Sequence, residues 1–372
     1  MSAPTTDRVE AAPAAPEEPA PRRRVRLPGE LVLRSERLGI SLRTDPRAIV
    51  VTAVIVALTA VVFAWSISVG DFSVPIRNVV EVLLGGGEGG SVFIVRELRL
   101  PRALLGVTVG AAFGVAGALF QRIADNPLAS PDVIGINSGA AATAAAVIIL
   151  WHGTSSQVTL GALAGGIGAA ALVYLLSYRS GISGYRLVLI GIGISAIGRA
   201  LTNYLLAKAE LNDATRAAVW LVGSLNGRSW SDLRPVLIAT IVLVPLAVAL
   251  SRQLRMLELG SDTAIGLGTA VHRTQAVMML IGVLLAALAT AAAGPIVFVS
   301  LVAPQIAKRL TGVRTVGLLP AAAVGAFLLI ASDLVARRLF APTELPVGII
   351  TGVLGAPFLL YLLARGNRIG RG

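Results

Sequence analysis

The chain has 372 residues, of which 55% are hydrophobic and only 14% are charged, and its mean hydropathy is +0.80. Soluble domains carry about a quarter charged residues, so this composition excludes an ordinary soluble protein. The formal net charge of +12 does not require nucleic acid, because arginines that flank apolar stretches anchor the topology of membrane proteins. We therefore expect a protein of the lipid bilayer with no nucleic-acid partner.

Residues that bind metals are scarce. The chain has no cysteine, and its two histidines, His152 and His272, lie far apart in sequence at the ends of apolar stretches. A protein metal site needs several such ligands close together. We therefore expect no metal site and no cofactor bound by this chain.

Residues 1–45 are interpreted as a disordered cytoplasmic tail. The segment is rich in Ala, Pro and Glu over its first thirty residues, and it lacks the apolar core that a signal peptide needs. Its arginine cluster at 22–26 is either a positive-inside signal or a contact with anionic lipid.

Residues 46–365 contain the apolar stretches and are predicted to form a transmembrane domain. The stretches are continuous rather than alternating, which favours helices over a barrel. About ten are long enough to span a bilayer or nearly so, which predicts a ten-helix all-α domain and a cytoplasmic C-terminal tail at 366–372. The expected spans are Ala48–Val69, Ala103–Phe120, Val133–Trp151, Val158–Tyr178, Leu187–Ala207, Leu233–Leu250, Ala276–Ala293, Pro295–Leu310, Val316–Phe340 and Leu345–Ala364.

Basic residues occur on both sides of this domain. The expected cytoplasmic segments Gln121–Asp132, Tyr178–Arg186, Ser251–Gln275 and Lys308–Arg314 all carry Arg or Lys, as does the C-terminal tail. The expected external segments are basic too, which departs from the positive-inside rule and suggests docking of an acidic soluble partner. These external cations are Arg96, Arg99, Arg102, Arg199, Lys208, Arg216, Arg337 and Arg338.

Small residues within the spans indicate close helix packing. Glycines recur every four residues at Gly106, Gly110 and Gly114, and as the pairs Gly161/Gly165 and Gly348/Gly352. This spacing lets helix backbones approach closely in lipid. It is compatible with ordinary packing, which is the commoner case, and with a bundle that can rock.

Acidic residues within the spans are few, and Asp333 is the clearest. Proton-coupled carriers usually need ionisable residues at mid-membrane. A proton-coupled secondary transporter therefore remains the weaker alternative.

The segment Ser251–Gln275 is too polar to span a membrane. Its sequence predicts one short helix that Gly260 ends and a second that begins at Ser261 and ends at Gly266 or Gly268. Two such helices form a rigid cytoplasmic knob suited to coupling with a soluble subunit, or else a plain connector. The sequence has no GxxxxGK[ST] phosphate loop and no catalytic constellation, so we expect no enzyme and a separate chain for any ATP hydrolysis.

Several longer motifs are spread along the chain. They are RLPR at 99–102, NPLASPDVIG at 126–135, WLVGSLNGRSW at 220–230, LELGSDTAIGLG at 257–268, AGPIVFVSLVAPQIAKRL at 293–310, and SDLVAR followed by ELPVGIITGVLGAP. With these motifs the chain resembles the permease subunits of bacterial ABC importers for iron–siderophore complexes and vitamin B12, the FecCD type, over nearly all of 48–365. The second and third motifs look most like those of ferric-catecholate permeases, such as the ferric enterobactin permeases.

The resemblance implies a type II ABC importer fold with ten transmembrane helices in the bacterial cytoplasmic membrane and both termini cytoplasmic. It implies a second, related permease subunit, two ATPase subunits that use ATP, and a siderophore-binding lipoprotein or periplasmic protein. Permeases for vitamin B12 or haem share every motif, so those cargoes stay open.

The resemblance also implies roles for particular residues. Arg99, Arg102 and Arg337 match positions that form salt bridges to the binding protein, and Gln305 stands where the family usually has His. An outer-gate region in a short external helix is implied for Trp220, Gly223, Ser224 and Asn226. The ATPase coupling loop is implied for Leu257, Glu258, Leu259, Gly260, Ser261, Asp262, Thr263, Ala264, Gly266, Leu267 and Gly268.

Overall fold

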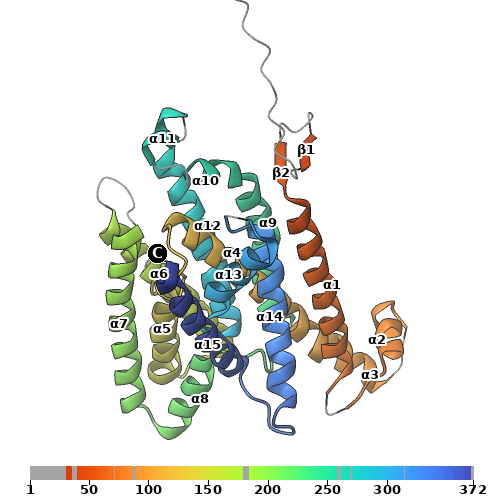
Figure 1. The fold of residues 1–372 in the computed structure, drawn as a ribbon. Helices are drawn as coiled ribbons and strands as arrows, with labels where there is room; N and C mark the ends of the chain where they lie inside the picture. The colour runs from red at the N-terminus through yellow and green to blue at the C-terminus, as the bar shows by residue number, and fades with distance from the viewer. Residues whose placement is uncertain are drawn as a thin grey trace, which may run out of the picture.

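The computed structural model describes residues 31–35, 40–70, 72–86, 89–178, 184–257, 261–268, 270–313 and 315–369. These residues form one helical bundle with a small β-hairpin at its N-terminal side (Figure 1). The elements in chain order are β1 (Leu31–Ser35), β2 (Ile40–Thr44), α1 (Pro46–Ser68), α2 (Ile76–Leu83), α3 (Gly90–Phe93), η1 (Ile94–Arg99), α4 (Leu100–Ile123), α5 (Ile136–Trp151), α6 (Ser155–Ser177), α7 (Gly184–Lys208), α8 (Leu211–Val222), α9 (Trp230–Ala249), α10 (Ser251–Leu257), α11 (Ser261–Gly266), α12 (Val271–Ala293), α13 (Val299–Thr311), α14 (Leu318–Arg338) and α15 (Val347–Ile369).

Among the described residues, seven helical segments are long and apolar enough to cross a membrane, and two shorter apolar helices, Ile136–Trp151 and Val347–Tyr361, accompany them. The all-α membrane fold is therefore confirmed, whereas the count of ten spans stays a prediction. The remaining apolar stretch forms α13, which has only 13 residues because it begins after the irregular segment at Gly294–Phe298.

The two ends of the bundle differ. The short helices α10 and α11 lie at one end, and α2, α3 and α8 lie at the other (Figure 1). We call these the α10 end and the α8 end. The short helices α2, α3 and α8 at the α8 end were not among the sequence-predicted spans, because each is too short to cross a bilayer.

The predicted tails differ from the structure where they are described. Within residues 1–45, β1 and β2 pair antiparallel, with Leu31 opposite Thr44 and Ser35 opposite Ile40. The alternating apolar residues of LVLRS and ISLRT suit a strand, and the Ala/Pro composition that suggested disorder belongs to residues 1–30, outside the described ones. At the other end, α15 continues to Ile369, so most of the predicted C-terminal tail is helical, and residues 370–372 lie outside the described ones.

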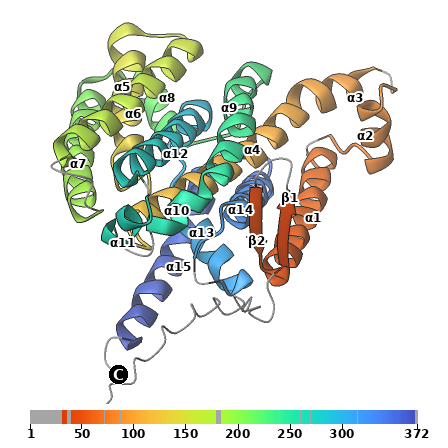
Figure 2. The same cartoon turned by 90° about the horizontal axis from the view of Figure 1, so that it is seen from above.

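Helix α4 lies at the centre of the bundle. In its most apolar stretch 83% of the residues are buried within the protein, against 11% in α1. It packs against α14, α12, α13 and α9, while α5, α6 and α7 form a neighbouring group. Figure 2 shows α4 between this group and α1.

The α4–α14 contact is a backbone-to-backbone contact. A Cβ added at Gly110 would overlap the carbonyl of Gly325, and one added at Gly114 would overlap the carbonyl of Ala321. Gly325 in turn lies directly against the carbonyl of Gly110. Gly110 and Gly114 of the four-residue glycine period thus mark a face of α4 that another helix approaches closely.

We expect Gly110→Leu to lower the free energy of unfolding by about 1–3 kcal/mol, because the new side chain must push α14 away from α4. The measurement is the thermal unfolding midpoint of the detergent-purified protein. The matched control is Gly168→Leu on α6, where an added Cβ has no neighbour within 4 Å among the described residues. Equal losses in the two variants would contradict the role given to the α4–α14 contact.

Candidate functional site

A cluster of charged side chains joins α4 to α14 at the α8 end. The Arg102 guanidinium donates to both carboxylate oxygens of Asp333, with the shortest distance at 3.0 Å, and its Nη1 lies 2.8 Å from Glu344 Oε2. Arg337 Nε lies 3.2 Å from the second Asp333 oxygen. Asp333 is only 2% exposed, so its charge is stabilised by two arginines rather than by water.

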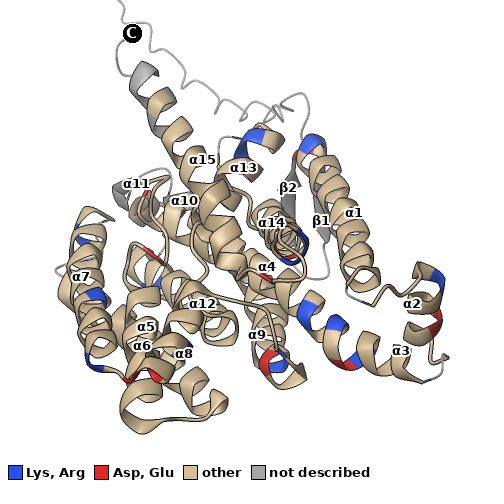
Figure 3. Ribbon diagram, turned by 90° about the horizontal axis from the view of Figure 1, so that it is seen from below, with Lys and Arg blue, Asp and Glu red and all other residues tan. Residues whose placement is uncertain are grey.

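The same cluster reaches the end of α1. Arg99 donates to the backbone carbonyls of Ile67, Ser68 and Phe72, and Arg337 donates to the backbone and side-chain oxygens of Ser66. The structure therefore brings together the three arginines that the sequence singled out. We call Arg99, Arg102, Asp333, Arg337 and Glu344 the end cluster. Figure 3, which views this end of the molecule, shows Lys and Arg at the start of α4 and at the end of α14.

The predicted outer-gate residues lie beside the end cluster, but most of them are not helical. Trp220 is in α8, whereas the helix ends at Val222 because Gly223 adopts a positive φ of 78°. The Ser224 N–H then donates to the Ala293 carbonyl at 2.8 Å, and Asn226 Oδ1 accepts a 3.5 Å hydrogen bond from Arg102. The expected external helix is thus corrected to a helix end followed by a turn.

Gly223 is also the point where three segments meet. Its carbonyl accepts from the Gly348 N–H at the start of α15, and a Cβ on it would lie 2.9 Å from Ile296. The turn therefore links α8 to the end of α12 and the start of α15.

At the α10 end, the segment Ser251–Gln275 forms the two short helices that the sequence predicts. α10 ends at Leu257, and α11 covers Ser261–Gly266, after which Gly268 adopts a positive φ of 79°. Glu258, Leu259 and Gly260 lie outside the described residues. Figure 1 shows the two helices projecting beyond the bundle, and we call them the α10–α11 knob.

Gln305 takes part in a buried polar contact near this end. Its Nε2 donates to Gln121 Oε1 at 2.5 Å, and Gln121 Nε2 donates to the Leu301 carbonyl at 3.0 Å. Gln305, which stands where the family usually has His, thus forms a buried hydrogen bond. The contact ties α13 to the end of α4.

A second polar group, which sequence reasoning missed, surrounds Asp132 in the segment between α4 and α5. One carboxylate oxygen accepts from Asn137 Nδ2 and the other from Ser300 Oγ at 3.1 Å, while Thr290 donates to Asn137 Oδ1 at 2.6 Å. Burial raises the pKa of the Asp132 carboxyl to about 6, and the hydrogen bonds from Ser300, the Phe298 backbone and Asn137 oppose that rise. The signal in the sequence that could have indicated this group was the presence of these four polar residues in otherwise apolar surroundings.

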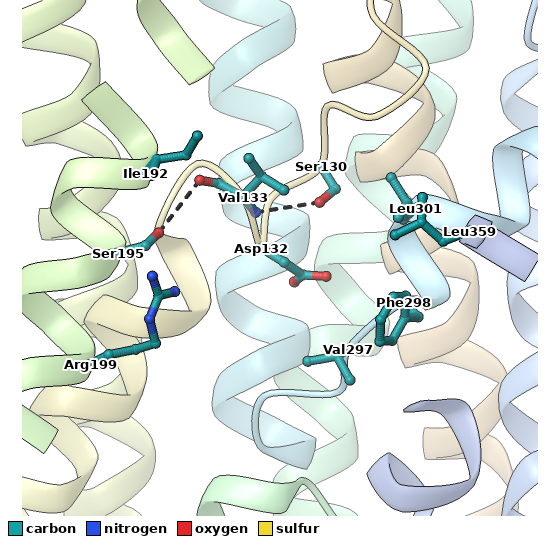
Figure 4. Close-up of a pocket in the computed structure, with 10 residues that line it drawn as sticks. All are labelled: Ser130, Asp132, Val133, Ile192, Ser195, Arg199, Val297, Phe298, Leu301 and Leu359. Carbon is teal, nitrogen blue, oxygen red and sulfur yellow. Dashed lines mark hydrogen bonds between the residues drawn. The ribbon is translucent and has the colours of Figure 1, made fainter. Parts of the chain in front are cut away.

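This segment borders a pocket of about 320 Å³ between α7, α13 and α15 (Figure 4). Its wall includes Ser130, Asp132, Ser195, Arg199, Phe298 and Leu359. Arg199 was expected among the external cations, although its position also falls within the predicted span Leu187–Ala207; in the structure it lies within the membrane-length helix α7. Among the described residues, no group of three or more His, Cys, Asp or Glu is placed to hold a metal ion.

We expect Asp333→Ala to lower stability by about 3–5 kcal/mol, because it leaves two largely buried arginines without their shared carboxylate. Glu344→Gln is the matched control; its side chain is 33% exposed, so the expected loss is below about 1 kcal/mol. Thermal unfolding of the purified protein compares the two. A small loss for Asp333→Ala would show that the end cluster does not hold α4 to α14.

The chain is similar in sequence to known permease proteins. The chain is 42% identical to the ferric enterobactin transport system permease protein FepG of Escherichia coli K12 over 87% of its own length and 98% of that protein. It is 38% identical to the iron(3+)-hydroxamate import system permease protein FhuG of Bacillus subtilis 168, covering 86% of this chain and 98% of FhuG.

A solved structure agrees with the sequence matches. A transporter described as of the metal-chelate ABC type, in an inward-facing conformation, superposes with a TM-score of 0.75 at 27% identity, covering 85% of this chain and 99% of that one. Residues 58–365 match the FecCD transport family, and the chain therefore belongs to that family.

Proposed function

We propose that this chain is the permease subunit of an ABC importer that carries a ferric siderophore, of the catecholate class, across the bacterial cytoplasmic membrane. The observation that carries the proposal is the match, over almost the full length of both proteins, to permeases named for ferric chelates. The identity to the ferric enterobactin permease is 42%, above the 38% for the hydroxamate permease FhuG and for the Fe(3+) dicitrate permease FecD of Escherichia coli K12. This difference favours catecholate.

The proposed complex contains this chain, a second related permease, two ATPase subunits and a siderophore-binding protein. In support, α7 and α15 present apolar side chains outward, such as Ile197 at 66% and Val353 at 64% exposure, which lipid or a second permease would cover. The chain has no phosphate loop, so ATP would be hydrolysed by the partner ATPase and not by this subunit. Both termini are proposed to be cytoplasmic, on the side of the α10–α11 knob.

In the proposed cycle, the loaded binding protein docks at the α8 end on Arg99, Arg102 and Arg337 and their counterparts in the second permease. The Arg102 and Arg337 side chains are only 10% and 8% exposed and pair with Asp333, so docking on these two requires the end cluster to rearrange. Arginine–carboxylate pairs orient such docking, and the surrounding charge raises the association rate. ATP-driven closure of the ATPases then moves the α10–α11 knob, and the bundle changes between outward-open and inward-open states around a cargo path between the two permeases.

Permeases for vitamin B12 or haem remain the alternative cargo classes, and a cargo assay separates them. A proton-coupled carrier is less well supported. Asp333, the clearest acidic residue in a span, is paired with two arginines in the structure, and such a paired carboxylate is poorly suited to a proton relay.

The first test is uptake of radio-iron bound to a tricatecholate siderophore in host cells with and without this gene. We expect deletion to abolish uptake, the intact gene to restore it, and Arg99→Glu to reduce it. A reversed charge on the binding protein, from Glu to Arg, should then rescue Arg99→Glu, because the salt bridge re-forms with exchanged signs. Rescue separates a docking defect from damage to the contacts of Arg99 with the end of α1.

Full catecholate uptake after deletion would refute the cargo class. Unchanged uptake in Arg99→Glu would refute the docking role while leaving the importer standing.

The α10–α11 knob is tested at Gly266. A Cβ there has no neighbour within 4 Å in the described chain, so Gly266→Leu should leave the fold intact. If the knob sits in a cleft of an ATPase, the larger side chain should uncouple the complex: uptake falls at least about tenfold while ATP hydrolysis continues. Hydrolysis and uptake are measured in the same membrane preparation, and normal coupling would make the knob a connector.

A further inference from the structure

Arg199 is a cation in the interior of a membrane-length helix. It precedes the end of α7 at Lys208 by nine residues, a rise of about 13 Å along the helix axis. Its side chain is exposed on the bundle, and no hydrogen bond or ion pair to the described residues accounts for its charge. A charged side chain at this depth is too costly to face hydrocarbon, so this side of α7 must border water or another polar group.

The helix stripe that contains Arg199 forms one wall of the pocket between α7, α13 and α15. Ile192, Ser195 and Arg199 are spaced three and four residues apart, which places them on one face of α7, and all three line the pocket. Figure 4 shows the Arg199 side chain directed along this wall toward Ser195. The guanidinium therefore lies at the pocket and not on the opposite, Ile197 side of the helix.

The other charged group in the wall, Asp132, forms no ion pair with Arg199. Both carboxylate oxygens of Asp132 already accept hydrogen bonds, from Asn137 and from Ser300. In Figure 4 the Asp132 carboxylate is directed toward Phe298, on the far side of the pocket from Arg199. Asp132 keeps its own charge but is held by two neutral donors and directed away from Arg199, so the exposed charge on the α7 side of the pocket is the positive charge of Arg199.

The chemistry of the wall selects a class of ligand. A free guanidinium attracts an anion and forms charge-assisted hydrogen bonds to oxygen, while Phe298, Val297 and Leu301 offer an apolar, partly aromatic surface opposite it. Catecholate groups are aromatic dianions, so a ferric tricatecholate keeps a net negative charge. Each hydroxamate loses a single proton, so a ferric trihydroxamate is neutral.

The size of the pocket suits part of a large chelate. A volume of about 320 Å³ lies at the lower end of the range of about 300–1,000 Å³ for sites of small organic ligands. It would hold one arm of a ferric tricatecholate, with the rest of the chelate extending beyond the open side of the pocket.

We propose that Arg199 and the facing Phe298 side of the pocket form a binding site for the anionic, aromatic arm of a ferric catecholate. Arg199 then makes this subunit favour negatively charged chelates over neutral ones. The inference rests on the proposed import function and specifies the side chain that would recognise the cargo inside the membrane.

The first test does not depend on transport and uses the absence of cysteine from the sequence. A single thiol introduced by Ile192→Cys is reacted in membranes with a negatively charged and a positively charged water-soluble thiol reagent. We expect the anionic reagent to be favoured, and Arg199→Gln to lower the ratio of the two rates at least about fivefold, because one full charge two helical turns away sets the local potential. Ile197→Cys, on the opposite side of α7, should react with neither reagent.

An unchanged rate ratio in the Arg199→Gln background would overturn the inference whatever the chain transports. So would an unreactive Ile192→Cys under conditions in which Asn212→Cys, exposed on α8, reacts fully.

The second test measures uptake of the radio-iron tricatecholate. We expect Arg199→Gln to reduce uptake about tenfold, the effect of losing one hydrogen bond to a charged group, and Arg199→Lys to retain most of it. The matched control is Lys208→Gln, which removes one positive charge from the same helix outside the pocket, where Lys208 lies 5.6 Å from the Tyr204 ring. Binding-protein-stimulated ATP hydrolysis should be unchanged in all three variants.

Failure of the proposed import function and failure of the Arg199 inference give different results. If the unmodified gene restores no uptake of any ferric chelate, the import function fails, and the thiol-reagent ratio still decides whether Arg199 creates an anion-attracting pocket. If the gene restores uptake and Arg199→Gln is as active as the unmodified protein, the import function stands and the inference is wrong.

Discussion

The close contact between α4 and α14 is the constraint on which the other features of the structure depend. In a membrane the hydrophobic effect does not drive helices together, so association relies on close packing and polar contacts. Here both occur on the same helix pair. Gly110 and Gly325 bring the two backbones together along the span, and Arg102 pairs with Asp333 at the α8 end.

This contact fixes the regions that carry the proposed function at both ends of α4. At the α8 end it holds the end cluster, including the arginines proposed to receive the binding protein. Toward the other end, Gln121 ties α4 to α13, and the segment after α4 is held by the hydrogen bonds of Asp132 to Asn137 and Ser300. The wall of the pocket at Asp132 is therefore built on the central helices, whereas α7 contributes Arg199 from the periphery.

Several features were predictable because they depend on local sequence. The Ser251–Gln275 segment gave two short helices, since its glycines and its polarity act within a few residues. The glycine period of α4 correctly indicated a close-packed face. It did not indicate that α14 is the helix that uses this face, because that choice depends on a contact more than two hundred residues away in the chain.

Other features depended on distant residues and were not predictable. Arg337 follows Asp333 by four residues on α14, so that pair is local in sequence. The sequence does not show that Arg102 of α4 shares the same carboxylate, because this pairing depends on how α4 and α14 are aligned. Asp132, Asn137, Thr290 and Ser300 are unremarkable singly and form a group only when four segments meet.

Composition and apolar length by themselves determined that this is a helical membrane protein, since each span must satisfy its own backbone hydrogen bonds in lipid. The tertiary structure alone decided that Arg199, whose position falls within the predicted span Leu187–Ala207, lies beside a pocket. The reason is physical: apolar length is a property of one segment, whereas the surroundings of a charge are set by the helices packed around it.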